Sequence, residues 1–200
     1  MSASDAFGLF GCGLLGLAAI AILIPLRRFP LRVRYTVVAA AAFAFLIPIG
    51  DLPVAAYVRG LIGDLSAATL VLAGAACFTQ VTGRALIGRR DKLAVCWLLA
   101  LAAAFLYPFA LGWTRFDPYA LGYGSIAFLT ALLVITLAAW WARLHVIVLV
   151  VIAAALAYLV GAYESRNLWD YLIDPLASVY ALVRLLPPRT VLQQPASRSP

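Results

Sequence analysis

The sequence predicts an all-α fold: a polytopic integral membrane helix bundle with six transmembrane helices and a seventh, short or kinked segment. Hydrophobic residues make up 66% of the 200 residues and charged residues only 12%, and the mean hydropathy is +1.02. A soluble globular chain is about half apolar and a quarter charged. The apolar residues also form continuous runs of about 20 residues, the length of a membrane-spanning helix. A transmembrane β-barrel would instead show short segments of alternating polarity.

Three helices are predicted in the first half of the chain. The first covers residues 7–26. Asp5 precedes it without any Lys or Arg, and cations follow it, so it is unlike a cleaved signal peptide and its N-terminus is expected outside. The second helix covers residues 35–49 and ends at the turn IGDLP. The third covers residues 60–79.

Three further helices and the seventh segment are predicted in the second half. The helices cover residues 93–113, 124–142 and 146–163, and Pro108 is expected to kink the first of them. The seventh segment, 168–186, contains two Asp and one Pro, and its acids come first and its cations last. That order fits a crossing from outside to inside. The alternative is an amphipathic helix that lies in the outer interface.

Residues 1–186 are therefore expected to form a single transmembrane domain. The polar, Pro-rich tail 187–200 is expected to be disordered and cytoplasmic. The abundant Ala, Leu and Arg, with a single Lys, suggest a GC-rich bacterial genome, which indicates the bacterial inner (cytoplasmic) membrane.

Both signs of charge predict the same orientation. With the N-terminus outside and the seventh segment crossing, twelve of the fifteen basic residues fall on the cytoplasmic side, as the positive-inside rule requires. Seven of the eight acids fall outside or at the outer boundary, although the rule does not demand it. The Arg-rich loops RRFPLRVR and RALIGRRDK would also attract anionic lipid headgroups.

Small residues spaced four apart predict close helix–helix contacts. Two such ridges occur: Gly8, Cys12 and Gly16 in the first helix, continued by Ala19, and Ala153, Ala157 and Gly161 in the sixth. A homo-oligomer or a protein partner that packs on these faces is the alternative to packing within the chain. Membrane lipids are the other expected partners. Nucleic acid is not expected, because the cations are divided among short loops.

The outer face collects the residues that could bind a ligand. They are Arg59, Asp64, Trp113, Arg115, Asp117, Glu164, Arg166, Trp169, Asp170 and Asp174. Arg can hold a phosphate or carboxylate through two hydrogen bonds, aromatic rings stack on sugars, and carboxylates accept hydroxyls. This mixture would suit a lipid-linked sugar or a phospholipid headgroup. The alternative is an ordinary interfacial belt of Trp and Tyr with solvated loop charges.

Local spacing assigns structural roles to part of this set. Asp64 is expected in the first turn of the third helix, paired with Arg59, Arg115 or Arg166. Arg166, Asp170 and Asp174 are spaced four apart and would share one stripe of the seventh segment. Asn167 could cap that helix, and Trp169 would anchor it at headgroup depth.

Asp174 remains the residue of this segment that most suggests function. It precedes Pro175, a residue that often marks a break in a membrane helix.

The sequence lacks the motifs of common catalytic sites. It has no P-loop, no GxSxG and no HExxH, its single histidine is His145, and its three cysteines are isolated, so we expect no cofactor and no metal. We therefore expect a non-catalytic inner-membrane protein. It would act as a membrane subunit, or a lipid-headgroup-binding partner, in an envelope lipid or polysaccharide system. The alternative is a membrane enzyme or flippase that handles a lipid-linked substrate at the outer face.

Overall fold

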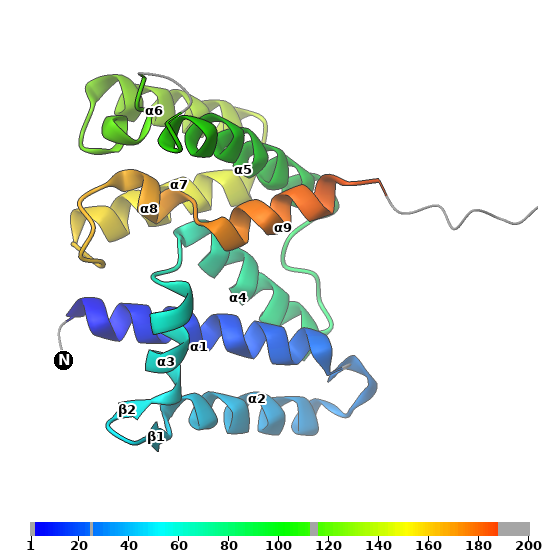
Figure 1. The fold of residues 1–200 in the computed structure, drawn as a ribbon. Helices are drawn as coiled ribbons and strands as arrows, with labels where there is room; N and C mark the ends of the chain where they lie inside the picture. Colours follow the sequence, from blue (N-terminus) through cyan, green and yellow to red (C-terminus); the bar gives the residue numbers. More distant parts are fainter. Residues whose placement is uncertain (1–2, 25, 113–115, 188–200) are drawn as a thin grey trace, which may run out of the picture.

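The computed structural model describes residues 3–24, 26–112 and 116–187, and Figure 1 shows a bundle of helices with one small β-hairpin. The elements in chain order are α1 (Ala3–Leu23), η1 (Leu26–Arg28), α2 (Leu31–Leu46), β1 (Pro48–Ile49), β2 (Leu52–Pro53), α3 (Val54–Ile62), α4 (Ala67–Thr82), α5 (Arg89–Ala110), η2 (Tyr119–Gly122), α6 (Ile126–Trp141), α7 (His145–Leu159), α8 (Leu168–Leu172) and α9 (Pro175–Leu185).

The longer helices alternate in direction. In Figure 1, α1, α2, α4, α5, α6, α7 and α9 run back and forth between the same two ends of the molecule, and α3 crosses α1. Helix α4 lies against α1 and α7, and α9 packs along α5. Because the direction alternates, successive connections fall at opposite ends of the bundle.

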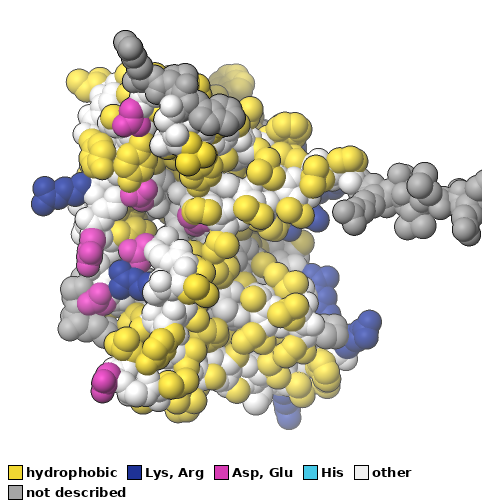
Figure 2. All heavy atoms as spheres, in the orientation of Figure 1, with side chains coloured by type: hydrophobic (Ala, Val, Ile, Leu, Met, Phe, Trp, Pro, Cys, Tyr) yellow, Lys and Arg dark blue, Asp and Glu magenta, His cyan; other side chains and the backbone are white. Residues whose placement is uncertain are grey.

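Opposite charges gather at these two ends (Figure 2). The acidic end holds the start of α1, the hairpin, the α3–α4 connection and the segment between α7 and α8. The basic end holds the α1–α2, α4–α5 and α6–α7 connections and the end of α9. The fold therefore places the acids and most of the cations as the alternating sequence pattern predicts.

Helix length supports a membrane protein without confirming six spans. Residues Ser4–Leu23 within α1 and all of α5, 20 and 22 residues long, are long and apolar enough to cross a membrane. Helices α4, α6, α7 and α9 are apolar but only 11 to 16 residues long. A span needs about 17 to 25 residues. The six-span bundle therefore stays a prediction.

Two predicted helices are each broken into two. The third, expected as one helix over 60–79, ends as α3 at Gly63, whose φ of 76° favours glycine, and restarts as α4. Ser66 caps α4 by accepting a hydrogen bond from the amide of Thr69. Asp64 therefore lies in the connection between α3 and α4. The prediction that it lies in the first turn of a helix is wrong. The seventh segment breaks at Asp174 into α8 and α9.

The small-residue ridge of α1 is used inside the chain. A Cβ atom on Gly8 would lie 2.3 Å from Nε of Arg59, and one on Gly16 would lie 2.0 Å from the ring of Phe45 in α2. Both glycines allow close approach of neighbouring elements. Gly161 does not extend a ridge on α7, because the helix ends at Leu159 and Gly161 has a φ of 63°. It terminates α7 instead.

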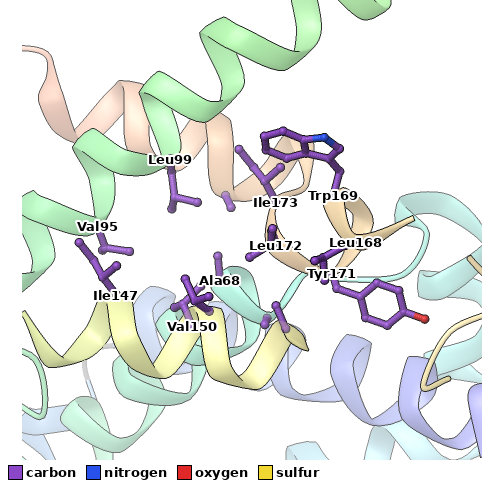
Figure 3. Close-up of a cluster of buried hydrophobic side chains, with 14 of the residues drawn as sticks. Ala68, Val95, Leu99, Ile147, Val150, Leu168, Trp169, Tyr171, Leu172 and Ile173 are labelled. Atoms are coloured by element: carbon purple, nitrogen blue, oxygen red, sulfur yellow. The ribbon is translucent and has the colours of Figure 1, made fainter. Parts of the chain in front are cut away.

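The hydrophobic core lies where α5, α7, α8 and α9 meet the start of α4. Figure 3 shows its side chains converging from these elements, among them Ala68, Val95, Leu99, Ile147, Val150, Leu168 and Leu172. Trp169 belongs to this core and is only 6% exposed. Its ring lies 4.5 Å from that of Phe128, and its Nε1 donates to the carbonyl of Pro118 at 2.9 Å. The indole is therefore enclosed by protein, and the anchoring of Trp169 at headgroup depth stays a prediction.

Candidate functional site

A cavity of about 380 Å³ opens at the acidic end, between the end of α5 and the elements that surround α8. We call it the acidic cavity. Its polar lining consists of Asp64, Tyr107, Tyr119, Tyr163, Ser165, Asp170 and Asp174. Three of the predicted site residues therefore meet here. The volume lies within the usual range of about 300 to 1,000 Å³ for small-molecule sites.

Asp174 joins two helices that are far apart in the sequence. Its Oδ1 accepts a hydrogen bond from the amide of Ala177 at 2.7 Å and so caps α9. Its Oδ2 accepts one from the amide of Ser66 at 2.8 Å, at the start of α4. Asp174 is 6% exposed and Ser66 is fully buried. A carboxylate is the acceptor best suited to two donors at once, because it offers two oxygens. These two hydrogen bonds give Asp174 a structural role.

Arg59 of α3 pairs with two carboxylates at the acidic end. Its Nε and Nη2 donate to the two oxygens of Asp64 at 2.7 and 3.2 Å, which is the two-pronged geometry of strong ion pairs. Its Nη1 donates to Asp5 of α1 at 3.1 Å. The hydrogen bonds to Asp64, followed by that to Asp5, raise the pKa of Arg59, although its burial opposes this. The predicted pairing of Asp64 with Arg59 is confirmed.

Asp170 accepts hydrogen bonds from two hydroxyl groups. The hydroxyl of Tyr119 donates to its Oδ2 at 2.9 Å, and that of Ser165 donates to the same oxygen. Burial, and then the hydrogen bond with Asp170, raises the pKa of Tyr119 well above its usual value. Asp170 is also the acid in the first turn of α8, and Asn167 caps this helix by accepting from the amide of Trp169. The cap at Asn167 was predicted.

Two further tyrosines tie the α7–α8 connection to its surroundings. The hydroxyl of Tyr163 donates to the carbonyl of Leu65 at 2.5 Å. Burial and then the charge of Asp64 raise the pKa of Tyr163 to about 12. The hydroxyl of Tyr171 accepts from the amide of Tyr163 and lies 2.9 Å from the carbonyl of Ser165. These contacts fix the wall of the acidic cavity.

The remaining predicted site residues are not brought into the cavity. Asp117, Glu164 and Arg166 are exposed, and Oδ1 of Asp117 accepts from the amide of Tyr119. Trp113 and Arg115 lie outside the described residues. The predicted stripe from Arg166 to Asp174 is wrong, because Arg166 precedes α8 and Asp174 follows it.

Sequence reasoning did not select Tyr107, Ser165 or the amide of Ser66 for the site. Ser66 directly precedes a helical run, as N-cap residues do, and this was the available signal. No sequence signal marked Ser165, because its hydrogen bond to Asp170 depends on the path of the chain between α7 and α8.

The chemistry open to the acidic cavity follows from these contacts. Each of its three carboxylates already accepts hydrogen bonds from the chain. Within the described residues, no group of three His, Cys, Asp or Glu is placed to hold a metal ion. No protein-family model, curated protein or solved structure matches this chain.

Proposed function

We propose that this chain is a multi-pass protein of the bacterial inner membrane, with its N-terminus and acidic end outside. It acts there as a non-catalytic membrane subunit, or as a lipid-headgroup-binding partner, in a system that handles envelope lipid or polysaccharide. Six helices cross the bilayer and α8 and α9 together form the short, broken seventh segment.

Exposed apolar helix faces support the membrane location. On α6, Leu129, Leu133 and Leu137 recur four apart and are 46%, 58% and 59% exposed, and Trp141 at its end is 90% exposed. On α2, Phe43 and Leu46 are each 69% exposed. Soluble monomers rarely expose apolar patches of more than a few hundred Å². Lipid would cover these faces, which lie on opposite sides of the bundle in Figure 1.

The observation that carries the subunit role is that carboxylates at the acidic end already make structural contacts within the chain. A general base needs a carboxylate that can take a proton from a substrate. Asp174 instead caps α9 and holds the start of α4, and Asp64 is paired with Arg59 through both oxygens. Exposed charges at this end, among them Glu164 and Arg166, suit contact with a partner or a headgroup at the outer surface.

Affinity purification in mild detergent tests the subunit role. The full chain, tagged and expressed at its native level, should bring down one partner in stoichiometric amount. A double variant, Glu164→Gln with Arg166→Gln, should lose that partner and keep its expression and monodispersity. Recovery of a lone monodisperse monomer from the wild-type chain would contradict the proposal.

The acidic cavity favours a second candidate, a membrane enzyme or flippase that acts on a lipid-linked substrate. Its three carboxylates and three tyrosines would then face the substrate. Asp64→Asn separates the two functions, because it keeps the size of the side chain and removes its charge. Loss of activity with normal expression and assembly would favour the enzyme, whereas loss of assembly would favour the subunit.

A further inference from the structure

A second cavity lies toward the basic end, between α1, α4 and α9. Its volume is about 540 Å³, and the α4–α5 connection helps to close it. We call it the basic groove. Most of its wall is apolar, with small alanines such as Ala19 and Ala76 beside Leu15, Leu72 and Leu176 from the three helices. A wall of this kind fits hydrocarbon, because apolar surface gains by contact with apolar surface and small side chains leave room.

Three cations stand at the basic end of this groove. They are Arg27 after α1, Lys92 in the first turn of α5, and Arg184 in the last turn of α9. Nη2 of Arg27 lies 3.4 Å from the carbonyl of Thr79, and Nζ of Lys92 lies 5.8 Å from the ring centre of Tyr180. Among the described residues that line the groove, none is Asp or Glu. The rim therefore carries positive charge that an anion would balance.

The wall of the groove also contains a buried hydroxyl without a partner. Thr69 is 6% exposed, and its Oγ1 makes no hydrogen bond within the described part of the chain. It lies ten residues from Thr79 on α4, which corresponds to about 15 Å along the helix. An unpaired hydroxyl is unfavourable in apolar surroundings. The inner part of the groove is therefore not completed by the protein's own side chains.

We propose that the basic groove binds one anionic membrane lipid from the cytoplasmic leaflet. The headgroup phosphate pairs with Arg27, Lys92 and Arg184, and an acyl chain lies between α1, α4 and α9. Basic pockets between membrane helices on the cytoplasmic side are suited to such headgroups. A water molecule or a lipid oxygen within the groove would satisfy Thr69.

Other occupants fit the charges less well. The chain's own tail, residues 188–200, contains Arg189 and Arg198 and no acid, so the rim would repel it. A second copy would bring an equally cationic rim against the first. The site lies at the end opposite to the acidic cavity, so it does not depend on the proposed subunit role, but it rests on the proposed location and orientation in the membrane.

Native mass spectrometry of the delipidated full chain in detergent tests the lipid site. Dioleoyl phosphatidylglycerol should bind as a single adduct at concentrations where dioleoyl phosphatidylcholine does not. Lys92→Gln and Arg184→Gln should each weaken phosphatidylglycerol binding about fivefold, the effect of removing one cation near a headgroup. Arg32→Gln is the matched control, because Arg32 is exposed at the same end without lining the groove, and it should leave binding unchanged.

A blocking variant tests the acyl-chain part of the site. Ala19 is exposed within the groove, so Ala19→Phe should fold normally and abolish the adduct by filling the space. Ala76→Leu, on the opposite wall, provides a second test. Equal binding of the two lipids, an equal loss in Arg32→Gln, or a dimer that forms through the groove and excludes lipid would each overturn the proposal.

Discussion

Replacement of Asp174 tests whether this buried carboxylate is structural. Asp174→Ala removes the acceptor for two amides, those of Ser66 and Ala177, which lie 2.8 and 2.7 Å from its oxygens. A buried amide left without a partner costs about 1 to 3 kcal/mol. The expected loss in the free energy of unfolding is therefore about 2 to 6 kcal/mol. Asp174→Asn keeps one oxygen and should lose about 1 to 3 kcal/mol, because one amide remains unpaired.

Reversible unfolding in mixed detergent, followed by circular dichroism, measures this effect. Glu164→Gln is the matched control, since it removes an acidic charge from an exposed side chain at the same end, and it should change stability by less than about 0.5 kcal/mol. If Asp174→Asn were as stable as Glu164→Gln, the structural role of Asp174 would be refuted.

Other positions give predictions of the same kind. Gly16→Ala should destabilise by about 1 to 3 kcal/mol, because its Cβ would meet the ring of Phe45 at 2.0 Å, whereas Gly13→Ala, with nothing within 4 Å, should be neutral or stabilising; thermal unfolding compares them. Stability should fall as the pH rises from 10 to about 12, because the unfolded state loses the Tyr163 proton first, and Tyr163→Phe should flatten a pH titration of the melting temperature. Thr69→Val should leave the stability of the delipidated protein unchanged or raise it by up to about 1 kcal/mol in the same unfolding assay, since the hydroxyl has no partner to lose; a clear loss would show that Thr69 is paired.

Features with a local cause were predictable from the sequence. The cap at Asn167, the break before Pro175 and the hairpin turn at Gly50 and Asp51 follow from residues within a few positions of one another. The pairing of Arg59 with Asp64 is also local, because only five positions separate them. Contacts over such short stretches can be predicted from the residue types alone.

Features that depend on distant contacts were not predictable. The bond between Asp174 and Ser66 joins residues 108 positions apart, and no pattern in either segment specifies it. Trp169 follows an apolar run, as an interfacial anchor would, and its burial depends on Pro118 and Phe128 from other parts of the chain. The break at Gly63 was missed because the apolar runs that flank it suggest one continuous span, and glycine is common in membrane helices.

The alternating charge pattern is the feature that connects the sequence to the function. It predicted which connections share an end of the bundle, and the fold brings those connections together (Figures 1 and 2). Both proposals depend on the orientation of the chain in the membrane. The acidic cavity would face outside, and the basic groove would open to the cytoplasmic leaflet.

Cysteine labelling in intact cells tests that orientation most directly. Asp117→Cys and Leu86→Cys place thiols at exposed positions of the acidic and basic ends, and Leu86 is 61% exposed. A membrane-impermeant maleimide should modify the cysteine at position 117 in intact cells and that at position 86 only after permeabilisation, with the parent chain as the background. Modification of position 86 from outside while position 117 stays protected would contradict the account.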